Sequence, residues 1–357
     1  MSKTIIHFIF NLGRGGAETM LVQVLKELKE YNNIVVTLQS ENSFDNELVC
    51  DKYICLNQER LLLFPVAALK LRKIIKKYKP DLVHSHLPLC NFVARLATPS
   101  GIPLITTIHT SIATIVDYQK WYFRILDKLT YQFKKSTIIF VSKRAMKDYF
   151  SVLKLSPNNS YILYTFVDIS KYHGKPFFHS GDVFRIVSVG SLRSPKNYDF
   201  LINAFRELKN NKIELTIYGK GPLQEKLQAS IDQSNVKIFL KGQVKNIQDV
   251  LHQFDLFVMA SIYEGFSLSV LEAMAIQLPL LLSNIHSFRE QCGNCAIYFD
   301  LNNTNDFIQK LKYCKDNKEE LWEKAKQGNQ RVINHFTLEH HMTGLRKIYL
   351  ETLNTKI

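Results

Sequence analysis

The sequence predicts an α/β protein built from two Rossmann-like, doubly wound parallel-sheet domains. Three observations lead to this prediction. The chain has 357 residues, more than one hydrophobic core usually serves. Short β-branched and aromatic runs alternate along it with segments of helical apolar spacing. The alternation is interrupted once, near residue 175, and then restarts.

The first domain is expected to span residues 1–175. Its apolar runs are separated by segments with helical spacing, such as Met20–Leu28. Strand–helix–strand succession of this kind is typical of a parallel sheet. The predicted strands are Ile5–Phe10, Ile34–Leu38, Leu82–His84, Leu104–Ile108 and Ile138–Val141.

Lys171–Gly181 is rich in turn formers and has no periodicity, so we expect it to link the two domains. The second domain is expected to span residues 176–335, and residues 336–357 to form a C-terminal helix that packs back on the N-terminal domain. Open parallel sheets bind ligands at the carboxyl ends of their strands. The predicted strands of the second domain are Ile186–Val189, Leu215–Tyr218, Ile238–Leu240, Leu256–Met259, Leu280–Leu282 and Ile297–Phe299.

The composition, with 46% hydrophobic and 22% charged residues, is that of an ordinary globular protein. The N-terminus lacks the features of a signal peptide, and no apolar run approaches the roughly 20 residues of a membrane span. We therefore predict a cytoplasmic protein. Of the six cysteines, only Cys292 and Cys295 have a metal-like spacing. Because a second pair of ligands is missing, free or buried thiols are favoured over zinc or redox use.

The net charge of +14 is concentrated in the first half of the chain. Residues 1–175 contain 24 Lys and Arg against 13 Asp and Glu, whereas residues 176–357 contain 22 against 19. A basic face suits anionic lipid, lipid diphosphates or nucleic acid. In the basic, aromatic segment Tyr118–Lys135, Trp121, Tyr122 and Phe123 are consecutive, so at least one ring should leave the buried face of a helix. Together with Lys70–Lys77, this segment predicts peripheral binding to the inner leaflet of the plasma membrane, although most such stripes simply face a core.

A helix N-terminus is predicted after the strand Leu256–Met259. Gly265 permits a tight turn and Ser267 is a plausible N-cap. Amides at a helix N-terminus form an anion site. The amides expected there are those of Phe266, Ser267 and Leu268.

Two carboxylates flank this anion site, in the segment Glu264-Gly-Phe-Ser-Leu-Ser-Val-Leu-Glu272. A nucleotide sugar has a matching layout, because a diphosphate joins its sugar to its ribose. Glu264 could bind sugar hydroxyls, the amides the phosphates, and Glu272 the ribose diol. Taken alone, the spacing is more often a helix cap followed by a solvated residue, so the context of the motif decides.

That context resembles glycosyltransferase family 4, retaining enzymes of the two-domain GT-B fold with a Glu-x7-Glu signature. The resemblance implies transfer of a sugar from a UDP-sugar or GDP-sugar to a hydroxyl of a glycan or lipid-linked acceptor, in bacterial capsule or O-antigen synthesis. It implies same-face attack in which Glu264 orients the sugar and the leaving phosphate takes the acceptor proton. No metal or other cofactor is expected, and the sequence offers no obvious Asp-x-Asp.

Two further resemblances lie in the first domain. The loop Gly13-Arg-Gly-Gly-Ala-Glu18 is similar to the family's Gly-Gly-Ala-Glu loop. This implies that Gly15 and Gly16 face the donor phosphates or the acceptor, although a structural turn is about as common for an isolated glycine loop. His109 is implied to lie beside the transferred sugar. His84 and His86 are implied to shape the wall of the cleft.

Other matches lie in the second domain, in the loops after its first three strands. In Val189–Asn197, Lys196 matches a family cation for the donor diphosphate. The arginine usual at the position of Ser191 is replaced by Arg193, two residues later. The loops that resemble nucleotide-binding segments contain Gly219, Gly221 and Val244.

Two rival functions remain open at this stage. A sugar-nucleotide epimerase on the same fold would turn over donor without an acceptor. A nucleic-acid-binding protein would explain the positive charge but not the loops, so nucleic acid is not an expected partner.

Overall fold

The computed structural model describes residues 2–44, 46–58, 64–113, 116–157, 159–172, 181–208, 210, 212–234 and 236–354. They form two compact units, each described here by itself. Unit 1 contains residues 1–165 and 339–357, and unit 2 contains residues 166–338. Most of the predicted linker, residues 173–180, lies outside the described residues. No described helix is long and apolar enough to cross a bilayer.

The core of unit 1 is a seven-stranded parallel sheet in the order β3-β2-β1-β4-β5-β6-β7. Residues of β1, β4 and β5 are almost all buried, because helices cover both faces of the sheet. The strands are β1 (Thr4–Ile9), β2 (Asn32–Thr37), β3 (Lys52–Cys55), β4 (Leu82–His86), β5 (Leu104–Ile108), β6 (Thr137–Phe140) and β7 (Ser160–Ile162).

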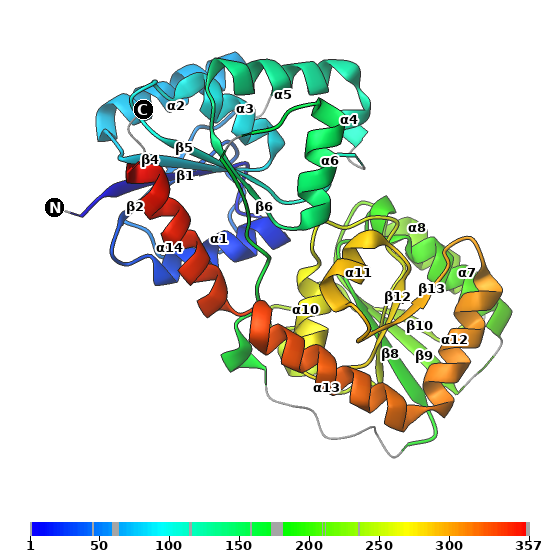
Figure 1. The fold of residues 1–357 in the computed structure, drawn as a ribbon. Helices are drawn as coiled ribbons and strands as arrows, with labels where there is room; N and C mark the ends of the chain where they lie inside the picture. The colour runs from blue at the N-terminus through cyan, green and yellow to red at the C-terminus, as the bar shows by residue number, and fades with distance from the viewer. Residues whose placement is uncertain are drawn as a thin grey trace. The chain divides into compact units, whose positions relative to one another are not determined.

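The helices of unit 1 lie in two layers (Figure 1). α2, α3 and α5 cover one face of the sheet, and α1 and α14 lie on the other. The C-terminal helix α14 is held there by Tyr349, whose hydroxyl lies 2.7 Å from His84 Nδ1, and by Arg346, which pairs with Glu30 at 2.6 Å. The helices are α1 (Gly16–Glu27), α2 (Phe64–Tyr78), α3 (Pro88–Ala97), α4 (Val116–Gln119), α5 (Trp121–Phe133), α6 (Lys143–Leu153) and α14 (Leu338–Asn354).

Unit 2 contains a six-stranded parallel sheet in the order β10-β9-β8-β11-β12-β13. The strands are β8 (Phe184–Val189), β9 (Ile213–Tyr218), β10 (Ile238–Leu240), β11 (Leu256–Met259), β12 (Leu280–Ser283) and β13 (Ile297–Phe299). The helices are α7 (Tyr198–Leu208), α8 (Gln224–Asp232), α9 (Gln248–Leu251), α10 (Leu268–Ala275), α11 (His286–Cys292), α12 (Thr304–Asp316) and α13 (Lys318–His335). Two short 3-10 turns, Ile169–Lys171 and Ser194–Lys196, complete the unit.

In each sheet the strand order reverses at one place. In unit 1 the reversal lies between β1 and β4, and in unit 2 between β8 and β11. Loops that leave the carboxyl ends of two such strands diverge to opposite faces and leave a crevice for a ligand. The loops after β8 and β11 carry the predicted residues Lys196 and Glu264, and the loop after β1 carries Gly15 and Gly16.

Candidate active site

The candidate site of unit 2 is built around a contact between Lys196 and Glu264. Lys196 Nζ lies 2.6 Å from Glu264 Oε1, and both side chains are mostly buried. Ser261 donates a second hydrogen bond to the same oxygen, at 2.7 Å. Lys196 and Glu264, which are far apart in sequence, come together because β8 and β11 are neighbouring strands and their loops begin at the same edge of the sheet.

The glycines of unit 2 allow the neighbouring loops to approach this contact. A Cβ on Gly190 would lie 3.0 Å from the Cε of Lys196, so a side chain there would crowd the lysine. Gly219 has φ +150°, and a Cβ on it would lie 1.9 Å from the carbonyl oxygen of Gly190. A Cβ on Gly221 would come within 2.5 Å of the carbonyl oxygen of Leu192. The loop after β9 therefore requires glycine at both positions.

The other predicted cation, Arg193, and the predicted nucleotide-binding loop after β10 both reach the surface of unit 2. Arg193 is exposed, and its guanidinium makes no hydrogen bond or ion pair with a described residue. Val244 is half-buried in the loop after β10. A guanidinium without a partner in the described part of the chain is available to an anionic ligand.

The N-terminus of α10 differs in part from the sequence expectation. Ser267 occupies the N-cap position, but its hydroxyl makes no capping hydrogen bond. Its amide donates to Gln291 Oε1 at 3.0 Å, and Gln291 Nε2 donates back to the carbonyl of Ser267 at 2.8 Å. Ser267 therefore offers no free amide to an anion. Phe266 is buried against the ring of Phe336.

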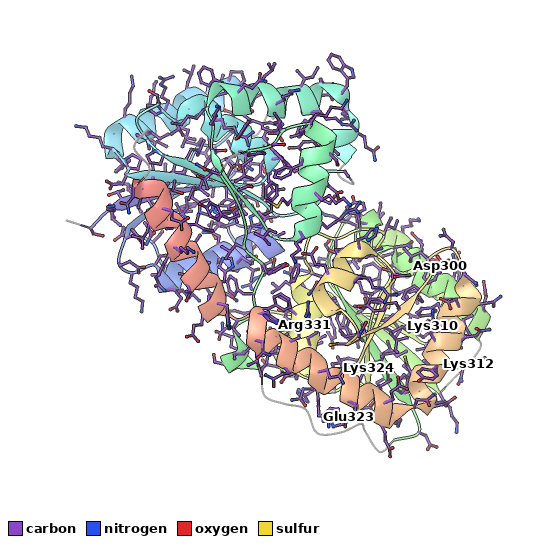
Figure 2. All side chains as sticks on the ribbon, viewed as in Figure 1. Asp300, Lys310, Lys312, Glu323, Lys324 and Arg331 are labelled. Atoms are coloured by element: carbon purple, nitrogen blue, oxygen red, sulfur yellow. The ribbon has the colours of Figure 1, made fainter. Side chains whose placement is uncertain are left out.

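Arg331, which Figure 2 labels on α13, fixes the helix that carries Gln291. Its guanidinium donates to the carbonyls of Gln291 and Glu290 at 2.8 and 3.0 Å. These carbonyls lie in the last turn of α11, where a helix lacks internal donors for them. The start of α10 is thus held in place through two successive contacts, and the helix N-terminus from Leu268 onward is the part left for an anion.

Glu272, one turn into α10, faces Tyr172, whose hydroxyl donates to Glu272 Oε1 at 3.1 Å. Burial raises the pKa of the Glu272 carboxyl to about 7, and the hydrogen bond from Tyr172 acts in the opposite direction. A carboxyl that is costly to ionise in the fold is typical of a site built for a ligand.

Replacement of Glu272 with glutamine is expected to stabilise the protein at alkaline pH. The pKa of Glu272 is higher in the fold than its ordinary value of 4.5, so the native state binds its proton more tightly than the unfolded chain does. The wild type therefore loses stability as pH rises from about 4.5 to 7. At pH 8 the variant should gain about 2–3 kcal/mol in free energy of unfolding, and the gain should shrink below about pH 5. Urea unfolding at both pH values measures this.

The control for this prediction is Glu207→Gln, which removes an exposed carboxylate from α7 of the same unit. It should change stability by less than about 0.5 kcal/mol at either pH. A gain in Glu272→Gln that is the same at pH 5 and pH 8 would show that Glu272 is not the buried acid described above.

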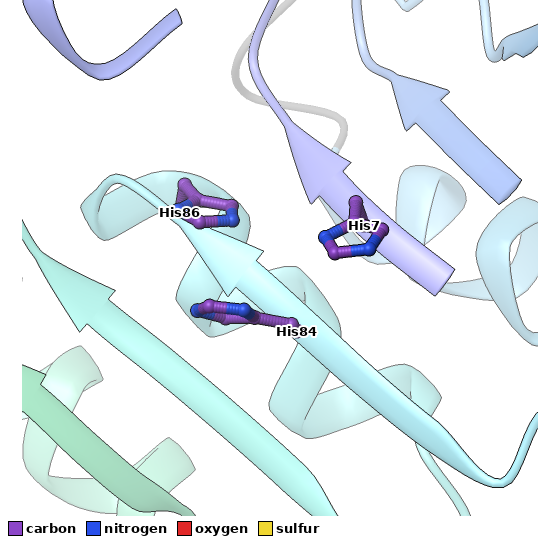
Figure 3. Close-up of side chains that lie close together, drawn as sticks. All are labelled: His7, His84 and His86. Atoms are coloured by element: carbon purple, nitrogen blue, oxygen red, sulfur yellow. The ribbon is translucent and has the colours of Figure 1, made fainter. Parts of the chain in front are cut away.

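In unit 1, the histidines at the carboxyl ends of the strands form a buried group. His109, directly after β5, has Nε2 at 3.2 Å from Nδ1 of His86. Burial lowers the pKa of His109 to about 4, so its imidazole is neutral at pH 7. His84 and His86 of β4 and His7 of β1 lie on one side of the sheet (Figure 3) and line an internal cavity of unit 1.

The predicted glycine loop ends at the N-terminus of α1. Gly15 is the N-cap of this helix, and Gly16 is its first residue, with open space where a Cβ would stand. The carboxylate of Glu18 fills the space beside Gly15, since a Cβ there would lie 2.3 Å from Glu18 Oε2. The negative charge of Glu18 beside this loop would repel a diphosphate. The carboxylate can instead accept hydrogen bonds from the hydroxyls of a ligand.

Two family models match the chain, one in each unit. The model "Glycosyltransferase Family 4" matches residues 14–171, and "Glycosyl transferases group 1" matches residues 183–317. The chain belongs to glycosyltransferase family 4. It is therefore an enzyme that transfers a sugar.

Curated relatives of this glycosyltransferase include two enzymes that act on diphosphoundecaprenol-linked sugars. The N-acetylgalactosamine-N,N'-diacetylbacillosaminyl-diphospho-undecaprenol 4-alpha-N-acetylgalactosaminyltransferase of Campylobacter jejuni is 28% identical over 85% of this chain and 88% of its own. The UDP-Gal:alpha-D-GlcNAc-diphosphoundecaprenol alpha-1,3-galactosyltransferase of Escherichia coli is 25% identical, over 81% of this chain and 80% of its own.

Solved structures confirm the predicted GT-B fold. Anabaena HepE in complex with UDP-glucose aligns over 98% of this chain and 99% of its own, with a TM-score of 0.84 and 14% identity. At this identity the likeness concerns the fold of the glycosyltransferase and not its substrates.

Sequence reasoning missed several residues of the site. Ser261 donates a hydrogen bond to Glu264. Gln291 accepts one from the amide of Ser267, and Tyr172 donates one to Glu272. Ser261 comes two residues after the predicted strand and could have been found as the first polar residue of its loop. The other two act across 24 and 100 residues, and no local pattern indicates such contacts.

Proposed function

We propose that this glycosyltransferase moves a sugar, with retention of configuration, from a UDP-sugar to a hydroxyl of a diphosphoundecaprenol-linked acceptor in bacterial surface polysaccharide synthesis. Unit 2 binds the donor and unit 1 the acceptor. The main support for the proposal is the ion pair between Lys196 and Glu264, which lies where the strand order of the second sheet reverses. The choice of UDP is supported by the name of the Escherichia coli relative, and the acceptor class by the names of both relatives.

On the donor side, the proposed work of Lys196 is to stabilise the departing diphosphate. Cleavage of the anomeric bond builds negative charge on that group, and fixed cations aimed at it lower the barrier. A diphosphate brings more charge than the single carboxylate that holds Lys196 here, so it competes for the ammonium group. Glu264, released from the lysine, then orients sugar hydroxyls. Arg193 adds a second cation, whose guanidinium has no ion pair with a described residue to break.

On the acceptor side, His109 and the loop before α1 are proposed to bind hydroxyl groups. A neutral imidazole can exchange a hydrogen bond with a hydroxyl, as donor or acceptor according to its tautomer, without repelling a positive charge that develops on the sugar. Glu18, beside Gly15, is a further acceptor for such a donor. Both groups suit an uncharged glycan better than a phosphate.

The test is a product assay with the full-length protein. A panel of UDP-sugars and GDP-sugars is incubated with and without a diphosphoundecaprenol-linked N-acetylhexosamine, and the anomeric configuration of the product is read by NMR. UDP release that requires the acceptor and gives an α-linked product from an α-donor supports the proposal. Epimerised donor in the absence of acceptor would overturn it.

We propose that the basic unit 1 also binds an anionic membrane surface through α5. Trp121, Ile125, Leu129 and Phe133 recur every four residues along this helix, and they are 71%, 46%, 56% and 68% exposed. Residues at this spacing share one face of a helix. Of the three consecutive rings, Trp121 and Tyr122 are exposed, as predicted, while Phe123 packs on Phe92.

Charge favours a lipid surface as the occupant of this face. Lys120, Arg124, Lys128 and Lys135 lie along the exposed face of α5 and at its ends, and the one acidic residue of the helix, Asp127, is buried. Exposed rings and aliphatic side chains with basic neighbours are the composition of interfacial helices. On α2, Leu69 is 62% exposed and is followed by four exposed cations, Arg72, Lys73, Lys76 and Lys77.

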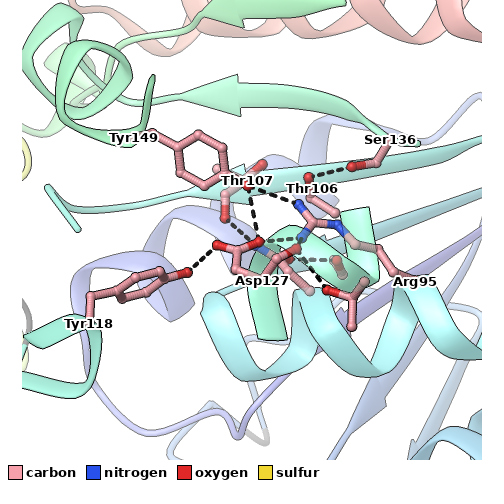
Figure 4. A network of polar contacts seen from close by, with 10 residues as sticks. Arg95, Thr106, Thr107, Tyr118, Asp127, Ser136 and Tyr149 are labelled. Atoms are coloured by element: carbon pink, nitrogen blue, oxygen red, sulfur yellow. Dashed lines mark hydrogen bonds and ion pairs between the residues drawn. The ribbon is translucent and has the colours of Figure 1, made fainter. Parts of the chain in front are cut away.

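The back of α5 is fixed by a buried polar network (Figure 4). Arg95 of α3 pairs with Asp127 of α5, and the hydroxyls of Tyr118 and Tyr149 both donate to the same carboxylate. This network anchors α5 against α3 and leaves its opposite face for a surface outside the protein.

The double variant Leu129→Ser/Phe133→Ser is expected to bind phosphatidylglycerol vesicles at least about 10-fold more weakly than wild type. Each apolar side chain that enters the interface contributes on the order of 1.5 kcal/mol. Vesicle co-sedimentation measures the partition coefficient. Leu350→Ser, which changes an exposed leucine of α14 in the same unit, should bind as wild type does. Equal binding of wild type to anionic and neutral vesicles would contradict the role given to the cations.

A further inference from the structure

Three buried histidines of unit 1 have the arrangement of a metal-binding triad. His84 and His86 alternate along β4 and therefore point to the same face of the sheet. His7 of β1 pairs with His84 in the register of the two strands, which places it on that face as well. One nitrogen of each ring lies within 4.8 Å of a nitrogen of both others (Figure 3). All three side chains are at most 6% exposed.

His7 presents a free lone pair, and its hydrogen bonds decide which nitrogen carries it. Its Nε2 lies 3.1 Å from Asn33 Oδ1. The amide nitrogen of Asn33 donates to the carbonyl of Leu28 at 2.8 Å, so the carbonyl end of this side chain must face the imidazole. His7 therefore carries its proton on Nε2. Its Nδ1 is a buried acceptor with no partner in the described structure.

His86 offers a second nitrogen of the same kind. Its Nδ1 contacts His109, while its Nε2 is buried and has no partner among the described residues. Both unpartnered nitrogens belong to rings that line a cavity of about 30 Å³. This volume exceeds the roughly 10–15 Å³ that a cavity needs to hold one water molecule. Two buried acceptors without donors are costly unless a ligand satisfies them.

The third ring, His84, is held by two hydroxyls. Its Nδ1 lies 2.7 Å from Tyr349 Oη, and its Nε2 lies 2.7 Å from Thr107 Oγ1. A neutral imidazole donates through one nitrogen and accepts through the other. If the hydroxyl that donates to His84 turns away, the accepting nitrogen of His84 has a free lone pair, while the other hydroxyl keeps the ring oriented. Each of the three histidines thus has one nitrogen held by a neighbour, which is the surrounding typical of metal-bound histidine.

We propose that His7, His84 and His86 bind a late first-row divalent cation, for which Zn²⁺ is the probe. Neutral imidazoles suit this class of ion. No Asp or Glu is among the described residues that line the cavity, so a water or hydroxide completes the coordination and offsets part of the charge. Zinc–nitrogen bonds of about 2.0–2.1 Å require the rings to draw closer together than they stand here. The evidence for this site does not rest on the transferase reaction proposed above.

Occupancy of this site has a consequence for His109. A cation on His86 Nε2 leaves the proton of that ring on Nδ1, and this proton is then donated to His109 Nε2. The ion would thereby fix the tautomer of His109 and the direction of its ring. His86 is in this sense a positioning residue.

The experiment measures zinc binding by the full-length protein after removal of metals with EDTA. One equivalent of Zn²⁺ should bind per chain in calorimetry, and at 100 times its Kd it should raise the Tm of unit 1 by about 5–10 °C. His7→Asn should lose this rise, each variant being compared with its own metal-free form. His252→Ala, which removes an exposed histidine of unit 2, should retain it.

A second measurement needs no variant. Zinc X-ray absorption of the loaded wild type should give three nitrogen ligands and one oxygen at about 2.0–2.1 Å. Absence of binding, retention of the Tm rise in His7→Asn, or a first shell that contains sulfur would each overturn the proposal. The last outcome would assign the ion to cysteine residues instead.

Discussion

Lys196→Ala is expected to lower kcat by about 10²–10³-fold and to change KM for the donor far less. Removal of one donor aimed at the charge of a transition state has an effect of this size, because the interaction strengthens as the charge develops. Lys196 is the cation that lies in contact with Glu264, at 2.6 Å. Steady-state rates with a UDP-sugar and an excess of acceptor measure both constants.

Two controls separate this role from a structural one. Lys226→Ala removes an exposed lysine from the same unit, where it pairs with Asp199 at 3.1 Å, and should leave kcat unchanged. Lys196→Ala also leaves Glu264 with Ser261 as its remaining donor among those described. If this orphaned carboxylate caused the loss, then Lys196→Ala/Glu264→Gln would recover activity. We expect the double variant to be at least as slow as Lys196→Ala.

Each strand that the sequence predicts correctly contains at least one buried residue. All six strands of unit 2 and the five inner strands of unit 1 appear as apolar runs. The two strands that sequence reasoning missed, β3 and β7, are the two edges of the first sheet. Neither strand contains a buried residue: those of β3 are exposed or half-buried, and the three of β7 are all half-buried. A strand without a buried side chain is under little constraint to carry an apolar pattern.

The candidate site divides in a similar way between what local sequence indicates and what it cannot. Lys196, Glu264 and His109 stand in loops directly after strands, where the βαβ pattern itself points to them. The bond between the amide of Ser267 and Gln291 joins two helices and depends on where α11 packs. His7 lies inside an apolar strand and contains no local signal of a partner. Its relation to His84 exists only once β1 and β4 are paired in register.

Asp127→Ala is expected to lower the free energy of unfolding of unit 1 by about 3–5 kcal/mol. Arg95 is fully buried, and its guanidinium would keep its charge without the carboxylate that pairs with it. Loss of one partner of a buried ion pair has a cost of this size because the remaining charge stays desolvated. Amide hydrogen exchange in β4 and β5 reports the opening free energy of this unit separately from unit 2. Asp117→Ala, which removes the acid of an exposed pair with Lys120, should change it by less than about 0.5 kcal/mol.

Substitution of both Arg95 and Asp127 tests how much of the lost stability comes from the hydrogen bonds around this ion pair. Replacement of a buried ion pair by apolar residues of similar size is often close to neutral. Here Arg95→Met/Asp127→Leu should recover only part of the loss, because the hydroxyls of Tyr118 and Tyr149 would be left without their acceptor. Further replacement of both tyrosines by phenylalanine should then restore stability. Full recovery of the free energy of unfolding in the double variant would show that the tyrosines contribute nothing. No recovery in the quadruple variant would show that the carboxylate holds α5 by its shape and not by its charge.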